Sequence, residues 1–407
     1  MEVHYHDYLQ LDKILNAQLL ESDKLDAHAH DEMLFVVIHQ AYELWFKQLH
    51  YETDSVLEIL ARPSLNDNSP ELQTVVHRIS RCVTILRVLV HQIDIMETMT
   101  PMDFLDFRNM LRPASGFQSW QFKELEAKLG LRFEQRHGKE YYTAQLRPEQ
   151  VGIIKKAETD QSLLQLLNSW LERLPFFQED HDWTGLRSHG NDMNLHPFWA
   201  EYRYQLDLSL SDAEKKNLEY FDSMFLGIGP SGESAAVTGK IPTRDGRVPV
   251  ATAREAATNT AGESAEPFEN TANPQATPGG RGAAPVATNH GQLSASLSPA
   301  ANRAALFIML YRGYPILQLP FQLLNGLLEI DEQLSSWRYR HMNMVHRMIG
   351  TRIGTGGSTG KDYLRGAADK HYIFREIAQL NSFLIERTRL PQLPDAIEAS
   401  LGFVHSS

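Results

Sequence analysis

The sequence contains one cysteine, Cys82, and no long run of apolar residues. A single cysteine cannot form an internal disulfide, and Cys82 falls on an apolar helical stripe, where a buried thiol behaves as a small hydrophobic group. No stretch approaches the roughly eighteen apolar residues of a membrane span. The opening residues, MEVHYHDYLQLDK, lack the basic and then apolar pattern of a signal peptide. We therefore expect a soluble, cytoplasmic protein without membrane contact.

Positive charge is also in short supply, with 39 Lys and Arg against 51 Asp and Glu and a formal net charge of -12. Binding to nucleic acid needs clustered basic residues that displace counterions from phosphates. The basic residues here are scattered among acidic ones, so we expect no nucleic-acid partner. The hydrophobic fraction of 42% is sufficient for a sizeable core.

Strict alternation of apolar and polar residues, the mark of β-strands, is absent, and apolar residues instead recur every three or four positions. This period predicts an all-α fold, and the long helices with short connections predict an antiparallel bundle. Asp31 is expected to cap the first long helix, and Thr100 with Asp103 to open another. The expected helices cover residues 34–60, 71–96, 162–174, 212–225 and 304–348.

Aromatic residues are nearly absent between residues 228 and 299, where Phe268 stands among Ala, Gly, Pro, Ser, Thr and Asn. Such a segment cannot bury enough apolar surface to offset its ordering entropy. We interpret it as a disordered insertion within a single catalytic domain spanning residues 1–407. A linker between two domains is the alternative, which composition does not distinguish.

Common hydrolase and zinc signatures are missing as well, including HExxH and GxSxG. His28 and His30 stand close together, but no cysteine or second acidic cluster completes a zinc shell around them. Seventeen histidines nevertheless raise the expectation of a metal or haem site. The spacing of individual histidines has to identify it.

The first candidate is His39, within DEMLFVVIHQAYELWFKQL at residues 31–49. Phe35 lies four residues earlier and shares its helix face, together with Tyr42 and Phe46. An imidazole on an aromatic face can bond a polar ligand atom or act as a base. The alternative, which periodicity alone favours, is a core histidine bonded to a neighbouring side chain.

The second candidate is His341, within WRYRHMNMVHRMIG at residues 337–350. It shares an apolar stripe with Trp337, Val345 and Met348. A haem iron needs one imidazole ligand and an apolar wall for the porphyrin, and this stripe could provide both. A packed structural histidine is again the alternative.

Two further patterns suggest anion binding. In MTPMDFLDFRNMLRPASGFQS, residues 99–119, Phe104 and Arg108 share a helix face, and a guanidinium among aromatic rings suits a carboxylate clamp. A surface ion pair is the alternative. GTGGSTGK, residues 354–361, departs from a phosphate-binding loop, but its backbone amides and the Thr355 hydroxyl could contact an anionic ligand. A flexible surface loop is the alternative there.

Taken together, the blocks HQAYELWFKQ, MTPMDFLDFR, RPASGFQSWQF, LPFQLL and WRYRHMNMVHRMIGTRIGTGGSTG resemble the tryptophan 2,3-dioxygenase family. The resemblance runs from Tyr8 to SFLIERTRLP near the end and omits the low-complexity segment and part of the middle. It implies a helical-bundle haem-binding fold of the tryptophan/indoleamine dioxygenase type, with one haem b per subunit. It also implies cleavage of the indole C2–C3 bond of L-tryptophan by O2 to N-formyl-L-kynurenine, the first step of tryptophan catabolism through the kynurenine pathway.

The resemblance also assigns roles to residues. It implies that His341 ligates the iron and that His39 is the catalytic histidine near the indole nitrogen. The substrate-binding residues that it implies lie on the helices of His39 and Arg108 and in the glycine-rich loop: Phe35, Val36, Val37, Ile38, Phe104, Arg108 and Thr355. Among these, Arg108 matches the carboxylate clamp and Thr355 the contact to the amino-acid end of the substrate.

Further residues match the family at the margins of the site. Ser115 and Gly116 match cofactor-binding positions, and Gly116 should let the chain approach the porphyrin closely. Tyr5 and Tyr8 match tyrosines that reach the active site of a neighbouring subunit, and the family implies a homotetramer. Some family members have tyrosine where Phe104 stands, so a hydroxyl contact is missing here.

Two other functions remain open at this point. A haem enzyme of the same fold could hydroxylate an aromatic amino acid instead, because a fold does not fix a function. A haem sensor or a non-catalytic helical interaction protein is the alternative from another class.

Overall fold

The computed structural model describes residues 2–138, 142–177, 181–183, 185–187, 189, 195–228, 296–352, 354 and 360–402, with side chains omitted at 360–363. These residues fall within one packed unit of the chain. They form helices, and no β-strand occurs among them, so the all-α prediction is confirmed. Residues 229–295, which include most of the segment predicted to be a disordered insertion, lie outside the described residues.

The helices vary widely in length. The α-helices are α1 (Tyr5–Leu9), α2 (Leu11–Leu15), α3 (Glu21–Lys24), α4 (His30–Leu60), α5 (Pro70–Met96), α6 (Pro101–Arg108), α7 (Trp120–Leu129), α8 (Pro148–Thr159), α9 (Leu163–Leu171), α10 (Pro197–Ser209), α11 (Lys216–Phe221), α12 (Pro299–Leu310), α13 (Pro315–Ile349), α14 (Gly360–Lys370), α15 (Arg375–Gln379) and α16 (Asp395–Leu401).

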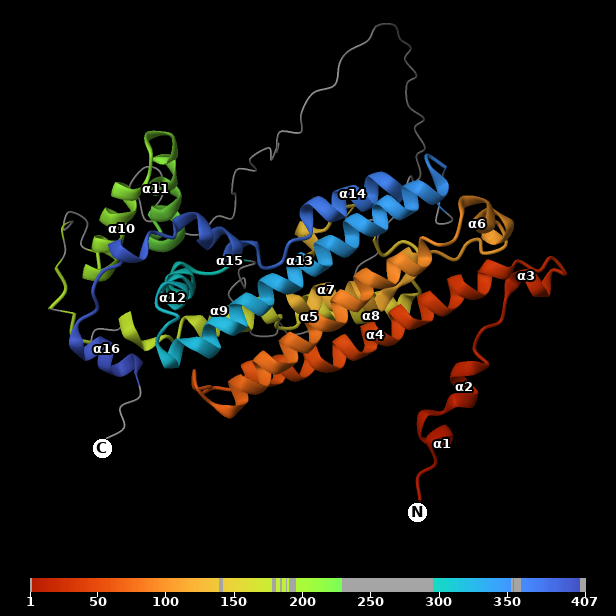
Figure 1. Cartoon of the computed structure of the whole chain (residues 1–407), viewed down its shortest axis with the longest axis horizontal. Coiled ribbons are helices and arrows are strands. Elements are labelled where there is room, and N and C mark those ends of the chain that lie inside the picture. The colour runs from red at the N-terminus through yellow and green to blue at the C-terminus, as the bar shows by residue number, and fades with distance from the viewer. Residues whose placement is uncertain are drawn as a thin grey trace, which may run out of the picture. The chain divides into compact units, whose positions relative to one another are not determined.

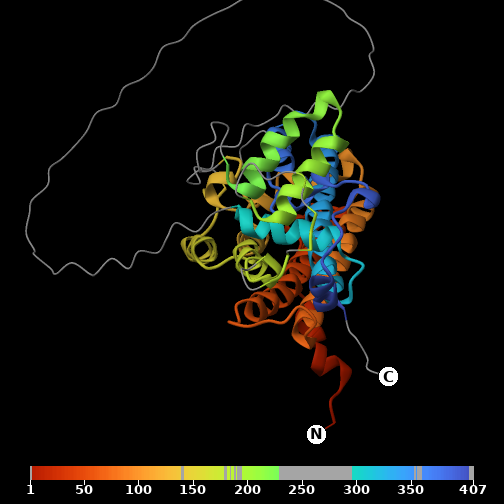
Figure 2. The same ribbon diagram turned by 90° about the vertical axis from the view of Figure 1, so that its left-hand side faces the viewer.

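Three long helices, α4, α5 and α13, run side by side along this unit (Figures 1 and 2). Each presents an apolar stripe to the others, as expected for a 3.6-residue period. The start of α5 is well defined because the Ser69 hydroxyl accepts a hydrogen bond from the Leu72 N–H at 3.1 Å and Pro70 occupies the first turn. Helix α14 folds back along α13, and α7 packs on α4 and α8.

A second, smaller group of apolar side chains lies apart from the main core. It is formed by the first turns of α4, the end of α5 with the connection that follows, α6 and the last turns of α13, and we name it the α4–α6–α13 cluster. Its buried members are Ala29, Ile38, Met96, Met99, Phe107 and Met348.

Some predicted helix boundaries are confirmed and others are wrong. Thr100 caps α6 through a reciprocal capping box with Asp103. Asp31 does not cap α4, because α4 begins one residue earlier, at His30, and Asp31 lies in its first turn. The run predicted over 304–348 is two helices, since the chain turns before Pro315. The run over 212–225 is also broken, into a 3-10 turn, α11 and a π-helical segment.

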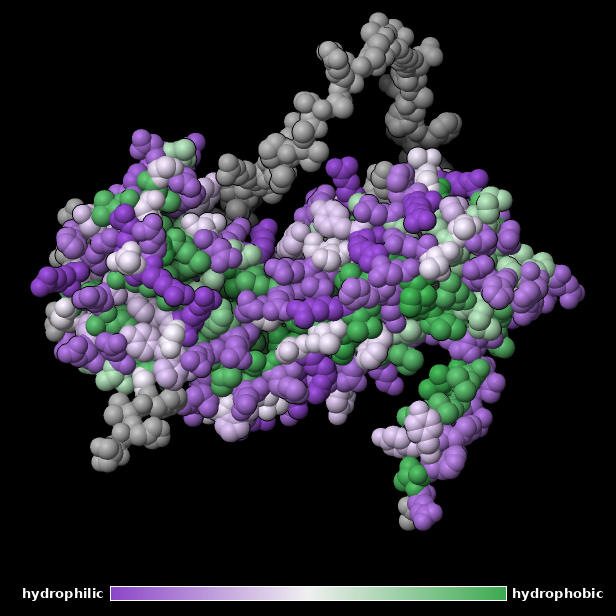
Figure 3. All heavy atoms as spheres, in the orientation of Figure 1, coloured by the Kyte–Doolittle hydropathy of each residue, from purple (hydrophilic) through white to green (hydrophobic). Residues whose placement is uncertain are grey.

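Residues 2–16 form an arm beside the bundle (Figure 1). The arm meets α4 at its base, where the Gln40 side chain donates to the Ala17 carbonyl at 3.0 Å. Figure 3 shows apolar surface along it, and its exposed apolar side chains include Tyr5, Tyr8 and Leu15. None of the described helices is long and apolar enough to cross a membrane.

Candidate active site

One end of the bundle brings the candidate residues of three helices together. Phe35 and His39 lie near the start of α4, Phe104 and Arg108 lie on α6, and His341 lies near the end of α13. Phe35 and Phe104 pack against the α4–α6–α13 cluster. His39 is close enough to His341 for its charge to lower the pKa of His341.

The ring of His39 is oriented by its own helix. Its Nδ1 donates a hydrogen bond to the Phe35 carbonyl oxygen at 2.7 Å. Because a carbonyl oxygen can only accept, the proton sits on Nδ1, and the neutral ring presents Nε2 as an acceptor. Desolvation lowers the pKa of His39, and the Phe35 carbonyl partly offsets this effect. The side chain is nevertheless exposed, so a ligand can reach this neutral imidazole.

An aromatic wall adjoins His39. The Phe35 ring centroid lies 4.1 Å from that of His39 and 5.7 Å from that of Phe104, on which it stacks. Phe107 completes the wall, with its ring edge-on to Phe35 at 5.6 Å and to Phe104 at 5.4 Å. Interlocked rings lose little entropy on ligand binding, and their faces suit a flat aromatic ligand.

His341 presents a different environment. Its ring stacks on Trp337, one turn earlier, with centroids 5.1 Å apart and planes 10° from parallel. Burial, with a smaller effect of His39, lowers the pKa of His341 to about 4. Its Nδ1 is buried and makes no hydrogen bond to the part of the chain that the structure describes. A half-buried imidazole that stays neutral at pH 7 has a lone pair available for a metal.

These features fit a haem. The porphyrin supplies four ligands to its iron, so a single imidazole such as His341 is sufficient. Met344 and Met348, one and two turns further along α13, pack into the α4–α6–α13 cluster and make the surroundings apolar. No group of three or more His, Cys, Asp or Glu that could hold a bare metal ion occurs in the described part of the chain. The His28 ring, considered above for zinc, instead forms a hydrogen bond between its Nδ1 and the Asp23 carboxylate at 2.6 Å.

Arg108 is the last residue of α6, and only 5% of it is exposed. Arg108 is therefore not a surface side chain, and its role as a carboxylate clamp remains a prediction. Desolvation lowers the pKa of Arg108, and the like charges of Arg112 and Arg352 lower it further. An anion close to Arg108 would reduce this repulsion, and a carboxylate matches the planar geometry of a guanidinium group.

Ser115 and Gly116 form a turn after α6. The Ser115 hydroxyl accepts from the Phe117 N–H at 3.3 Å, which caps the 3-10 turn Gly116–Gln118. A Cβ atom on Gly116 would meet no atom within 4 Å, so a flat ligand could approach the backbone there. The buried Lys123 ammonium donates hydrogen bonds to the carbonyls of Phe117 and Ser119, and these bonds hold the turn against α7.

The structure does not bring the other predicted site residues together on the helix face of His39. Ile38 is buried in the α4–α6–α13 cluster, Val36 is half-buried and Val37 is 44% exposed. Consecutive helical residues are turned by about 100°, so these three cannot all share the face of His39. Tyr5 and Tyr8 are exposed on the N-terminal arm.

The glycine-rich loop is the remaining predicted element. Thr355 lies outside the described residues, so its predicted role remains a prediction. Both ends of the loop are fixed, because α13 ends at Ile349 and α14, which follows the loop, packs along α13.

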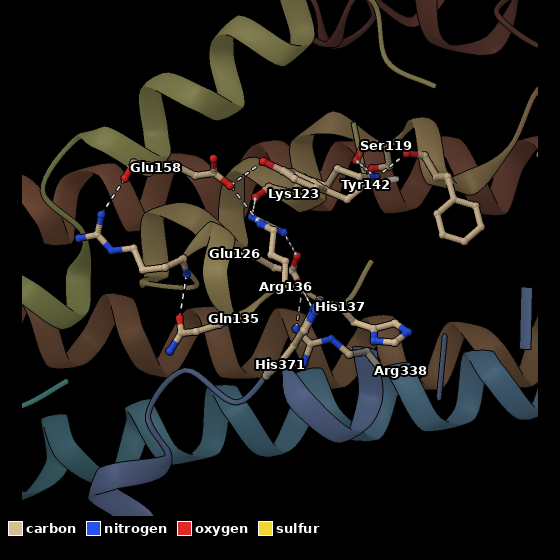
Figure 4. Close-up of polar contacts among 12 residues, drawn as sticks. Ser119, Lys123, Glu126, Gln135, Arg136, His137, Tyr142, Glu158, Arg338 and His371 are labelled. Atoms are coloured by element: carbon tan, nitrogen blue, oxygen red, sulfur yellow. Dashed lines mark hydrogen bonds and ion pairs between the residues drawn. The ribbon is translucent and has the colours of Figure 1, made fainter. Parts of the chain in front are cut away.

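A buried charged network supports α13 just before His341 (Figure 4). Glu126 of α7 accepts from Arg136 at 2.8 Å, from Arg338 of α13 at 2.7 Å and from His371 at 3.3 Å. The His371 and cationic partners hold the pKa of Glu126 well below its usual value despite burial. The sequence reasoning missed this network, since its members are scattered along the chain and nothing in their spacing marks them as buried.

Comparison with known proteins gives one consistent result. The family model described as tryptophan 2,3-dioxygenase matches residues 1–222 and 286–384. A tryptophan 2,3-dioxygenase of Bdellovibrio bacteriovorus is 38% identical over 403 residues, which cover 98% of both chains. Those of Dictyostelium discoideum and Rattus norvegicus are each 36% identical, over 99% and 98% of this chain and 89% and 86% of their own lengths.

Proposed function

The chain belongs to the tryptophan 2,3-dioxygenase family, and from this premise we propose how its residues carry out the reaction. It is an oxidoreductase, a dioxygenase that oxidises tryptophan. We propose that it cleaves the C2–C3 bond of the indole with O2 and releases N-formyl-L-kynurenine, the first step of the kynurenine pathway.

The cofactor is haem b, one per subunit, held by His341. The observation that carries this proposal is the half-buried His341 ring, which stacks on Trp337, has a buried Nδ1 bonded to no described group, and has a pKa that burial and the nearby His39 lower to about 4. Haem supplies the redox-active iron that the reaction of O2 requires. Ser115 and Gly116 would lie against the porphyrin, where the backbone is free of neighbouring atoms at Gly116.

His39 orients the substrate. With its proton held on Nδ1 by the Phe35 carbonyl, its Nε2 accepts a hydrogen bond from the indole N–H. Phe35 and Phe104 provide a flat wall for the indole ring and exclude water from it. His39 therefore acts by positioning the indole more than by removing its proton.

The amino-acid end of the substrate is recognised by charge. Arg108 binds the carboxylate with two parallel hydrogen bonds, and Arg112 and Arg352 add to the positive potential around it. Thr355 would bond the same end of the substrate from the glycine-rich loop. Anchoring both ends of L-tryptophan fixes the indole relative to the cofactor.

We also propose a cytoplasmic homotetramer. The N-terminal arm exposes apolar side chains, including Tyr5 and Tyr8, which suit a contact with a second copy of the chain. The two tyrosines would reach the active site of that copy. A cytoplasmic location agrees with a free, buried thiol at Cys82.

Absorption spectra and product analysis test the proposal. Purified wild-type protein should show a Soret band that changes when L-tryptophan is added to the ferrous form, and O2 should then yield N-formyl-L-kynurenine. The His341→Ala variant should lose haem, whereas His39→Ala should keep haem and turn over poorly. A hydroxylated product would contradict the proposed reaction. Loss of haem from His39→Ala but not from His341→Ala would show that the roles of the two histidines are reversed.

A further inference from the structure

Trp337 lies one helical turn before His341 on α13, and the two rings are nearly parallel. Their centroids are 5.1 Å apart and their planes differ by 10°. An indole is larger than an imidazole, so Trp337 covers one face of the His341 ring. Rotation of His341 about its side-chain bonds would break this stack.

Trp337 is itself held by two other helices. Its ring contacts the Tyr42 ring of α4 edge-on, at 6.0 Å and 67°, and the Phe122 ring of α7 at 5.0 Å and 43°. The Tyr42 hydroxyl donates to the Leu89 carbonyl of α5 at 2.7 Å. The Trp337 ring is therefore fixed relative to α4, α5 and α7 as well as α13.

The usual means of orienting a metal-bound histidine is missing from the described surroundings of His341. Such a histidine generally donates its second ring N–H to a carboxylate, a backbone carbonyl or a water molecule. Nδ1 of His341 is buried, and no described protein group accepts a hydrogen bond from it. The contact that does define the plane of the ring is the stack on Trp337.

We propose that Trp337 is a positioning residue that fixes the ring plane of His341 as an iron ligand, in the place of a hydrogen-bond acceptor. This inference rests on the proposed function, in which His341 holds the haem. It implies a neutral imidazole ligand whose orientation is set by packing between four helices.

Two substitutions of Trp337 separate orientation from simple loss of core volume. Trp337→Leu keeps an apolar side chain but removes the planar ring, whereas Trp337→Phe keeps a smaller planar ring. Trp170→Leu is the control, because Trp170 is a buried tryptophan of α9 in the main core, whereas Trp337 is partly buried against that core. Each holoprotein is examined by ferric EPR, by the ferrous iron–histidine stretching band in resonance Raman spectra, and by kcat and KM for L-tryptophan.

We expect Trp337→Leu to shift and broaden the iron–histidine band and to lower kcat roughly ten- to a hundredfold with little change in KM, since small errors of orientation cost this much. Trp337→Phe should recover most of both signals, and Trp170→Leu should leave the band unchanged. The band of Trp337→Phe should be shifted less than that of Trp337→Leu but still measurably from wild type, so this variant tests the inference even if Trp337→Leu does not fold.

The inference is overturned if the Trp337 variants that fold have the wild-type band and kcat. A failure of the proposed function would look different, because wild-type protein would then bind no haem or His341→Ala would retain it.

Discussion

At the scale of single residues, one backbone carbonyl decides which nitrogen His39 offers to a ligand. The Phe35 carbonyl fixes the proton on Nδ1, so the acceptor at Nε2 is set by the helix and not by the substrate. A ligand that donates a hydrogen bond is then bound without a change of tautomer. This arrangement favours an indole N–H over an N-methylated indole.

Arg108 gives the first prediction at this scale. Arg108→Ala should raise the KM for L-tryptophan by roughly 30-fold to several thousandfold, equivalent to the 2 to 5 kcal/mol lost when a buried charge pair is broken. The reason is that the substrate carboxylate loses its two hydrogen bonds. Steady-state kinetics with L-tryptophan measure the effect.

Tryptamine, which has no carboxylate, provides the control for Arg108. Wild-type protein should discriminate strongly between L-tryptophan and tryptamine, and Arg108→Ala should discriminate little. Arg108→Lys should fall between them, because lysine keeps the charge but not the planar fork. Unchanged discrimination in Arg108→Ala would remove Arg108 from the substrate site.

The candidate site could be predicted in part from spacing. The i, i+4 pairs Phe35 with His39 and Phe104 with Arg108 do share faces, as a helix requires. The burial of Glu126 could not be predicted, because it depends on contacts with Arg338 and His371, which are far away in sequence. Spacing also gives no means of telling a ligand histidine from a packed one.

At the scale of helices, the crossing of α13 and α5 depends on Gly326. A Cβ atom at Gly326 would lie 2.6 Å from Cγ2 of Ile79, closer than two carbon atoms tolerate. We predict that Gly326→Ala lowers the free energy of unfolding by about 1 to 3 kcal/mol through overpacking. Urea denaturation followed by circular dichroism measures the change.

A double-mutant cycle and a second glycine test this explanation. Ile79→Ala should lower the free energy of unfolding less in the Gly326→Ala background than in wild type, since removal of the Cγ2 methyl group relieves the overlap. Gly152→Ala on α8 is the control, because a Cβ there meets no atom within 4 Å. It should stabilise the protein by about 0.5 to 1 kcal/mol. Additive effects of Gly326→Ala and Ile79→Ala would contradict the proposed overlap.

The start of α10 gives a pH-dependent prediction. His196 caps this helix by accepting from the Phe198 N–H at 3.3 Å, and burial, with a smaller effect of Arg303, lowers its pKa to about 4. Below pH 6.5 the unfolded chain takes up a proton that the folded protein does not bind until about pH 4. His196 therefore makes the free energy of unfolding fall as the pH decreases between these values.

His196→Ser tests this effect, because serine is a good cap that does not titrate. Between pH 7 and pH 5 the variant should lose about 1 kcal/mol less stability than wild type, a value reduced for the partial exposure of the ring. Denaturant titrations at the two pH values give the comparison. Equal losses in both proteins would show that His196 is not the titrating group.

The sequence predicted which segments are helical better than it predicted where one helix ends and the next begins. The period correctly predicts α4, α5 and α9, since their apolar stripes are long and unbroken. The same period continues across the turn before Pro315, so α12 and α13 read as one helix in the sequence. The π-helical segment Asp222–Leu226 also keeps apolar residues at helical spacing.

At the scale of the whole molecule, the described residues on both sides of the low-complexity segment lie together. A Cβ atom on Gly227 would lie 3.7 Å from the Pro299 ring, and Asn302 donates to the Met224 carbonyl at 3.3 Å. The chain therefore leaves and returns at one place. This supports the proposal of an insertion within a single catalytic domain over a linker between two domains.

We predict that residues 232–292 can be replaced by a flexible linker of about ten residues, long enough to span the neighbouring ends. Haem content, kcat and a single unfolding transition should be retained. Differential scanning calorimetry and absorption spectra measure these properties. If the wild-type protein showed two unfolding transitions and the variant lost one of them, the segment would instead join separate domains.

The continuity of α13 has a consequence for the protein as a thermodynamic system. One helix carries His341, Trp337 and Arg338 and also crosses α5 at Gly326, so unfolding of the bundle would also disrupt the proposed haem site. Haem binding and folding would then be linked by mass action, and free haem at a hundred times its dissociation constant would add about 2.7 kcal/mol to the free energy of unfolding. The supply of haem would thus set how much of the newly made chain survives proteolysis.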